Sequence, residues 1–137
     1  MIIARTPYRV SFFGGGTDFP EHFQKHGGAV LSATIDNYVY TIVKRYHPVF
    51  PFRYRIVWKY TEEISTVAEI IHPTIRGGLQ TLQIDEPLEI HYIGDLPSNS
   101  GLGSSSSFAV GLLQCLAMLR GRIDSRFGLA QYAIKLE

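Results

Sequence analysis

The sequence is poor in cysteine and in charge. Its 137 residues include one cysteine, Cys115, so no internal disulfide can form. Charged residues make up 18% of the chain and the formal net charge is +1, which argues against a nucleic-acid-binding surface or a polybasic membrane anchor. Cys115 lies within an apolar stretch, where we expect a small core residue rather than a reactive thiol.

Long hydrophobic runs and metal-ligand spacings are also missing. No apolar run approaches the roughly twenty residues that a membrane-spanning helix needs, and residues 1–4 have no basic leader of a signal peptide. A cytoplasmic protein is therefore expected. The five histidines show no spacing typical of zinc ligands, and no Gly-x-Ser-x-Gly motif of a serine hydrolase occurs. The composition, with 45% hydrophobic and 12% aromatic residues, is typical of one domain with a packed core.

The order of the expected elements predicts an α+β fold. Periodicity and turn residues predict strands over residues 2–5, 9–13, 38–46, 53–60 and 88–93, the first two separated by a break at Pro7. Helical segments are expected over residues 18–23, 67–72 and 74–82, then a long helix that ends at Gly121 and a last helix from Ser125 onward. This order favours α+β over a doubly wound parallel sheet.

Residues 97–108, Pro-Ser-Asn-Ser-Gly-Leu-Gly-Ser-Ser-Ser-Ser-Phe, are the most informative segment. A predicted strand leads into them, and an apolar helix with Phe108, Leu112, Leu116 and Leu119 at helical spacing leads out. Free N–H groups and the dipole at a helix N-terminus favour an anion, and glycine lets the backbone approach it closely. The simpler alternative is a strand-to-helix turn with serine caps, although four consecutive serines exceed what capping needs.

Two common nucleotide-binding motifs do not fit this segment. It lacks the Gly-Lys-Ser/Thr of a Walker A loop, and it lacks the Gly-x-Gly-x-x-Gly fingerprint of dinucleotide-binding folds. The residues therefore indicate a phosphate-binding loop of another class.

That segment resembles the second motif of the GHMP kinases, which wraps the ATP phosphates. Residues 6–20, Thr-Pro-Tyr-Arg-Val-Ser-Phe-Phe-Gly-Gly-Gly-Thr-Asp-Phe-Pro, resemble the first motif of the same family. The Phe-Gly-Gly-Gly-Thr-Asp form is similar to the sugar-1-kinase branch, which includes heptose 7-phosphate kinases and, more distantly, L-fucose kinases. The resemblance covers essentially the whole chain. It implies that residues 1–137 form the ribosomal-protein-S5-domain-2-like N-terminal domain, with helices packed on a mixed sheet.

The resemblance also implies an ATP and Mg²⁺ site. Ser105 is the expected Mg²⁺ ligand, and backbone N–H groups of the loop would face the β- and γ-phosphates. The residues implied in ATP binding are Pro97, Ser100, Gly101, Leu102, Gly103, Ser104, Ser105 and Ser106.

By the same resemblance, the first motif supplies substrate-binding residues. Asp18 would accept hydrogen bonds from sugar hydroxyls, although as a residue type it is equally suited to cap a helix. Arg9 is suited either to neutralise phosphate charge or to form a structural ion pair. Glycines in the turn would let the backbone approach the substrate, and a tight turn alone would also require them. The full implied set is Arg9, Gly14, Gly15, Gly16, Thr17 and Asp18.

Glu137 is the second expected Mg²⁺ ligand. Spacing places Ala130, Ala133, Ile134 and Glu137 on one helix face, which we expect to look inward; a solvated terminal glutamate is the plain alternative. In the family, a helix after the serine loop carries a glutamate that binds Mg²⁺ with a loop serine. Family members continue with a Gly-rich loop, a catalytic aspartate and a C-terminal domain. We therefore expect a chain truncated at its C-terminal end, with the catalytic aspartate beyond residue 137.

The resemblance implies transfer of the γ-phosphate of ATP to the anomeric hydroxyl of a sugar phosphate such as D-glycero-D-manno-heptose 7-phosphate. The 137 residues alone are expected to show little or no activity. Alternatives are another GHMP sugar kinase, of fucose or galactose type, or a non-catalytic nucleotide-binding or oligomerising module. Trp58 and Tyr60 are candidates for the adenine wall near His72, with ordinary core positions as the alternative. Self-association is expected if apolar surface is left uncovered.

Overall fold

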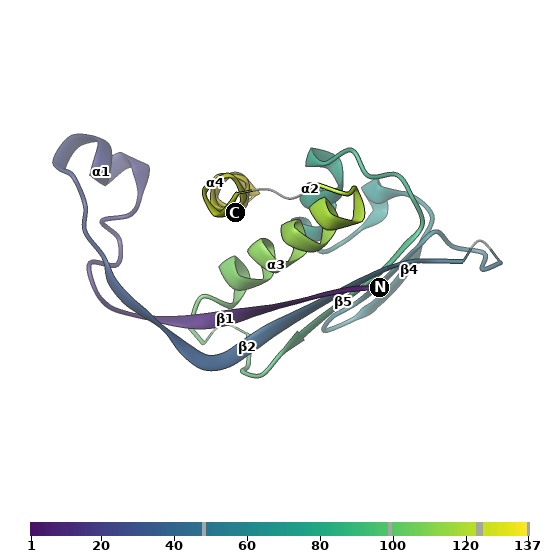
Figure 1. Cartoon of the computed structure of the whole chain (residues 1–137), viewed down its shortest axis with the longest axis horizontal. Coiled ribbons are helices and arrows are strands. Elements are labelled where there is room, and N and C mark those ends of the chain that lie inside the picture. Colours follow the sequence, from purple (N-terminus) through teal and green to yellow (C-terminus); the bar gives the residue numbers. More distant parts are fainter. Residues whose placement is uncertain (48, 99, 123–124, 137) are drawn as a thin grey trace.

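The fold is a single mixed sheet with its helices on one side (Figure 1). A computed structural model describes residues 1–47, 49–98, 100–122 and 125–136. The strands are β1 (Ile2–Phe13), β2 (Leu31–Arg45), β3 (Tyr54–Val57), β4 (Thr61–Ile64) and β5 (Leu88–Gly94). The helices are α1 (Pro20–His26), the 3₁₀ helix η1 (Val67–Glu69), α2 (Pro73–Thr81), α3 (Ser104–Leu119) and α4 (Arg126–Leu136). The predicted α+β class is confirmed.

The sheet has five strands in the order β1-β2-β5-β3-β4. β3 and β5 run parallel, and the other neighbours run antiparallel. The sheet is therefore mixed, as the resemblance implied.

The core lies between one sheet face and α3. Alternate residues of the strands point to this face, and α3 packs over β1 and β2 with α2 and α4 beside it. The predicted apolar stripe of α3 is confirmed, because Phe108, Leu112 and Leu116 are all buried. Cys115 lies in the same core, its thiol 3.6 Å from the Thr41 carbonyl, and burial raises its pKa to about 11. It is a core residue, as expected.

On the opposite face, charged side chains form a row across four strands. Lys44, Glu89, Arg55 and Glu63 are neighbours in register on β2, β5, β3 and β4. Glu89 is 5% exposed because it lies under its partners, with Lys44 Nζ at 2.8 Å and His91 Nε2 at 2.7 Å. Burial by itself would raise the pKa of Glu89, but Lys44 and His91 hold it below the usual value.

The expected break at Pro7 is wrong. β1 continues through Pro7, which pairs with Tyr38, and the irregularity is a register shift between Pro7 and Arg9. β1 is an edge strand, where the missing N–H of proline removes no ladder bond. Proline therefore produced a bulge rather than an end.

The single strand expected over residues 53–60 is also wrong. The chain reverses after Val57, where the Trp58 N–H bonds to the Tyr60 carbonyl, and it returns as β4. The helical segment expected over residues 67–72 is only the 3₁₀ turn η1, and Pro73 begins α2 instead of interrupting a helix.

The expected inward face of the last helix is confirmed for Ala133 and wrong for Ala130 and Ile134. Leu129 and Ala133 are buried against α3, whereas Ala130 is exposed and Ile134 is 68% exposed. The predicted cap is confirmed, because the Gly128 N–H bonds to Ser125 Oγ at 3.1 Å. Glu137 lies outside the described residues. No helix in the described part of the chain is long and apolar enough to cross a bilayer.

Candidate functional site

The serine loop, described at residues 97–98 and 100–106, follows β5 and includes the first residues of α3. Gly101 and Gly103 have φ of 73° and 74°, a left-handed conformation that glycine adopts without strain. Gly103 is the N-cap residue of α3, so no serine side chain caps the helix. The alternative in which the serines act as N-caps is therefore not what the structure shows.

Two of the serines face outward at this helix end. Ser104 and Ser105 form the first turn of α3, whose N–H groups have no carbonyl partner within the helix. Ser105 is exposed and Ser104 is half-buried. Nothing lies within 4 Å of a methyl group placed on Gly101, so the loop is open on that side. The arrangement offers N–H donors, hydroxyls and the positive end of the α3 dipole to an anion.

Ser107 has a different role from its neighbours. It is buried, and its hydroxyl donates a hydrogen bond of 2.8 Å to the Pro7 carbonyl of β1. The serine run is therefore divided: its beginning faces outward and its end fastens α3 to the sheet.

Arg9 lies against the serine loop. Its N–H donates to the Leu102 carbonyl at 3.0 Å, and its Cγ would be 3.1 Å from a methyl group on Gly103. Nη1 donates to Ser11 Oγ at 2.7 Å. Among the described residues no carboxylate pairs with Arg9, so the geometry favours a charge available to an anion over a structural ion pair.

The Gly14–Asp18 turn is built by close backbone contacts. Thr17 Oγ1 donates to the Gly14 carbonyl at 2.7 Å and accepts from the Ala29 N–H at 3.2 Å. A methyl group on Gly14 would lie 1.9 Å from the Ala29 carbonyl, and one on Gly28 would lie 2.2 Å from the Thr17 carbonyl. Glycine at these two positions is needed for the turn itself, and Thr17 is a structural tie.

Asp18 is exposed beside a pocket of about 390 Å³. It does not cap α1, because Phe19 is the N-cap residue; instead Oδ1 accepts from the Gly16 N–H at 3.0 Å. The pocket is lined by Thr17, Asp18, Phe23, Gly28, Ala29 and Val30. The carboxylate therefore keeps acceptor capacity for a ligand.

The two motifs lie on the same side of the sheet but are not in one pocket. Figure 1 shows α1 at the end of the β1–β2 ribbon, on the side where α3 also lies. β1 connects them: Arg9 contacts Leu102 of the serine loop, Pro7 contacts Ser107 just after it, and the strand then runs about 16 Å from Arg9 to Gly14.

Trp58 and His72, named in the expectation of an adenine wall, lie together in an aromatic cluster. The ring centroids of Trp58 and His72 are 4.7 Å apart, and those of His72 and Phe108 are 5.2 Å apart. Trp58 is half-buried and donates from Nε1 to Glu62 at 2.8 Å, whereas Tyr60 is 53% exposed. No sequence pattern pointed to Glu62, a buried carboxylate whose other oxygen accepts from the Ile71 N–H at 2.7 Å.

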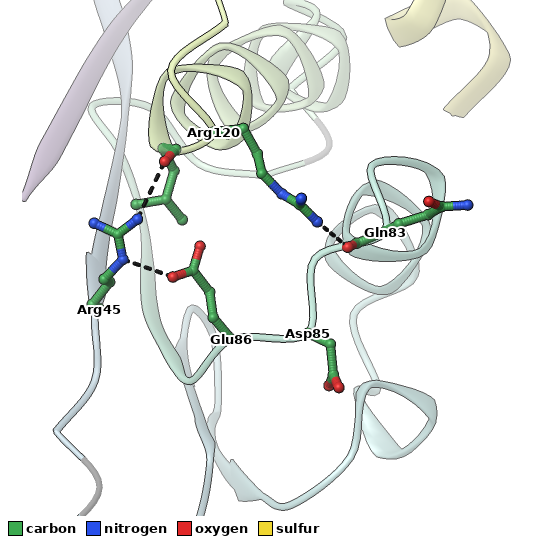
Figure 2. A pocket seen from close by; sticks show the side chains of 6 residues that line it. Arg45, Gln83, Asp85, Glu86 and Arg120 are labelled. Atoms are coloured by element: carbon green, nitrogen blue, oxygen red, sulfur yellow. Dashed lines mark hydrogen bonds and ion pairs between the residues drawn. The ribbon is translucent and has the colours of Figure 1, made fainter.

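A larger pocket, of about 500 Å³, lies at the opposite end of α3 (Figure 2). Arg45 donates from Nε to Glu86 at 2.6 Å and from Nη2 to the Leu119 carbonyl at 3.3 Å. Arg120 donates to the Gln83 carbonyl. These groups bond one another and hold the C-terminal end of α3, which leaves the serine loop as the better candidate site.

A family model described as the GHMP kinases N-terminal domain matches residues 54–137, which include the serine loop. The chain belongs to this family. A D-glycero-alpha-D-manno-heptose 7-phosphate kinase of Campylobacter jejuni is 30% identical over 99% of the chain, which includes the first motif.

Solved structures of GHMP kinases have the same fold. A D-glycero-D-manno-heptose 1-phosphate kinase from Bacteroides thetaiotaomicron matches 100% of the chain with a TM-score of 0.84 at 22% identity. A phosphomevalonate kinase of Streptococcus pneumoniae, solved with phosphomevalonate and AMPPNP, matches 99% with a TM-score of 0.72 at 17% identity. The chain spans 43% of the Campylobacter protein, 48% of the Bacteroides structure and 42% of the Streptococcus structure.

Proposed function

We propose that this chain is the nucleotide-binding N-terminal part of a sugar kinase. The kinase would transfer the γ-phosphate of ATP to the anomeric hydroxyl of a sugar phosphate, with D-glycero-D-manno-heptose 7-phosphate as the leading candidate. Membership of the GHMP kinases and the 30% identity to a heptose 7-phosphate kinase support this. A fucose- or galactose-type substrate is the alternative within the family.

The observation that carries the proposal is the open N-terminus of α3. The left-handed glycines Gly101 and Gly103 bring the Ser104 and Ser105 N–H groups to the surface, with Arg9 alongside. Phosphoryl transfer depends mainly on positioning and charge neutralisation, which this arrangement supplies. The ATP-binding set is Pro97, Ser100, Gly101, Leu102, Gly103, Ser104, Ser105 and Ser106.

Mg²⁺ fits the donor chemistry of this loop. The exposed Ser105 hydroxyl is a hard oxygen ligand, and no cluster of three His, Cys, Asp or Glu side chains competes with it among the described residues. Ser105 and Glu137 would hold the ion, with phosphate oxygens completing its ligands. When bound, Mg²⁺ would offset the charge of the phosphates.

The sugar phosphate would bind at the Gly14–Asp18 turn. Asp18 accepts hydrogen bonds from sugar hydroxyls, and Arg9 lies between the turn and the loop, where it offsets phosphate charge. The aspartate that orients the attacking hydroxyl would come from outside these residues. The 137-residue chain by itself would therefore transfer little phosphate, and turnover with heptose 7-phosphate at a typical kinase rate would contradict that.

A non-catalytic nucleotide-binding or assembly module is the alternative from another class. Calorimetric titration with MgATP distinguishes a nucleotide-binding chain from an assembly module, using the wild type, Ser105→Ala and the control Ser65→Ala, an exposed serine after β4. We expect binding by the wild type and the control, and at least tenfold weaker binding by Ser105→Ala. Absence of binding in all three would overturn the kinase proposal and favour an assembly role.

A further inference from the structure

The Tyr8 side chain is buried beside Leu96, in the segment that connects β5 to the serine loop. The side chain is 0% exposed, and its hydroxyl donates to the Leu96 carbonyl at 3.1 Å. Burial, and then the neighbouring Tyr92 hydroxyl, raise the pKa of Tyr8, so the group stays a protonated donor.

Tyr8 is the middle of three consecutive β1 residues that contact the segment from Leu96 to Ser107, which contains the serine loop. Pro7 accepts from Ser107 Oγ, Tyr8 donates to the Leu96 carbonyl, and the Arg9 N–H donates to the Leu102 carbonyl. The Pro7 and Arg9 contacts use the backbone of β1, which any sequence offers. The Tyr8 contact depends on the tyrosine side chain. Of the three contacts, it is the one nearest to the end of β5.

The Tyr8 hydroxyl occupies the space that a side chain at position 94 would need. A methyl group on Gly94 would lie 2.5 Å from Tyr8 Oη, closer than any real contact, and 3.6 Å from the Tyr92 hydroxyl. Gly94 is the last residue of β5, so the strand ends at a residue without a side chain, where the phenol passes to Leu96.

We propose that Tyr8 is a positioning residue for phosphate binding, acting through the Leu96 carbonyl on the serine loop. The inference rests on the proposed function, because it assumes that this loop receives the phosphates of a nucleotide. Donors held in place before the ligand arrives bind it without an ordering cost. Loss of the Tyr8 hydroxyl leaves the Leu96 carbonyl without this donor, so the serine loop that follows Leu96 is held less firmly. The loop contacts to phosphate then weaken, while contacts to the base do not.

Tyr54 offers a matched control. It is also 0% exposed and its hydroxyl also donates once, to Asp85 Oδ1 at 3.2 Å, but it lies on β3 away from the loop. Tyr8→Phe and Tyr54→Phe therefore each remove one buried hydroxyl from a retained ring. A general loss of stability would affect both variants alike.

The experiment measures the affinity of the wild type and both variants for Mg-AMPPNP and for adenosine. We expect Tyr8→Phe to bind AMPPNP about tenfold more weakly, the size of one hydrogen bond, with adenosine affinity unchanged. Tyr54→Phe should match the wild type with both ligands. Equal AMPPNP affinity of Tyr8→Phe and wild type, or an equal loss for both ligands, overturns the positioning role. A wild type that does not prefer AMPPNP over adenosine overturns the proposed function, and this inference with it.

A second measurement needs no ligand. Amide hydrogen exchange in Tyr8→Phe should be faster at residues 95–98 and 100–104 and unchanged in β3 and α2, whereas Tyr54→Phe should not affect the loop. Loop exchange equal to that of the wild type would overturn the inference even in a variant that folds normally.

Discussion

The Ser107 hydroxyl donates a hydrogen bond of 2.8 Å to the Pro7 carbonyl, which joins the first turns of α3 to β1. The bond is partly buried, since Ser107 is 6% exposed and Pro7 is half-buried. The contact links the two sequence motifs that lie a hundred residues apart. The strand that leads to the Gly14–Asp18 turn and the helix that begins at the serine loop are thus one structural unit.

Ser107→Ala should lower the free energy of unfolding by about 1–2 kcal/mol, because the Pro7 carbonyl loses its buried donor. Urea denaturation measures this. Ser105→Ala is the control, since its exposed hydroxyl should change stability by less than about 0.5 kcal/mol. Equal stability of the two variants would contradict the structural role of Ser107.

Elements with a clear local pattern were predicted well from the sequence. The strand at 88–93, the apolar stripe of Phe108, Leu112 and Leu116, and the Ser125 cap depend on short-range periodicity and on one capping oxygen. The position of the serine loop between β5 and α3 was predicted for the same reason, since glycine and serine at a strand-to-helix junction are a local signal.

The features that were not predicted from the sequence depend on contacts between distant residues. β4 is four residues with Glu62 and Glu63 at its centre, and only pairing with β3 makes it a strand. Pro7 was misjudged because its tolerance depends on an edge position in the sheet. The face of α4 was predicted only in part, because Leu129 packs with Ala133 against α3 and leaves Ala130 and Ile134 exposed.

Gly111 and Gly78 should respond oppositely to alanine. A methyl group on Gly111 of α3 would lie 2.8 Å from Thr6 Oγ1 and 3.1 Å from Thr41 Oγ1, so Gly111→Ala should cost about 1–3 kcal/mol of stability. On Gly78 of α2 the nearest atom would be at 3.4 Å, an ordinary contact, so Gly78→Ala should be neutral or gain up to about 1 kcal/mol. Thermal unfolding of both variants checks this, and a destabilised Gly78→Ala with a tolerated Gly111→Ala would contradict the packing of α3 on the sheet.

His72 should make stability depend on pH. Burial lowers the pKa of His72, an effect that Glu62 partly opposes, whereas the unfolded chain titrates near the ordinary value of about 6.5. Below about pH 6.5, His72 is protonated in the unfolded chain but stays neutral in the folded chain. The free energy of unfolding should therefore fall as the pH drops from about 6.5 toward the pKa of His72 in the folded chain. His72→Phe, which keeps a ring between Trp58 and Phe108, should show a shallower decline in denaturation series at pH 7.5 and 5.5.

Trp58 gives this test a spectroscopic signal. It is the only tryptophan in the sequence, and its ring lies 4.7 Å from His72. Its fluorescence should change with a midpoint below pH 6.5 in the wild type, and this transition should be absent in His72→Phe. The same transition in both proteins would contradict the assignment.

The arm formed by the end of β1, α1 and the start of β2 should promote self-association. Six large apolar side chains on it are 44% to 73% exposed, more than scattered surface residues require: Phe12, Phe13, Phe19, Phe23, Val30 and Leu31. Sedimentation velocity should show concentration-dependent association that Phe13→Ser and Phe19→Ser reduce. A monomer at every concentration would count against this expectation.

The central claim is that the serine loop binds the phosphates of a nucleotide. Amide chemical-shift mapping by NMR during titration with Mg-AMPPNP tests it most directly, because it reports the site residue by residue. We expect the largest changes at Gly101–Ser106 and Arg9, saturating with one ligand per chain, and much smaller changes there with adenosine. No change at these amides, or changes confined to the Arg45–Arg120 pocket at the other end of α3, would contradict the account.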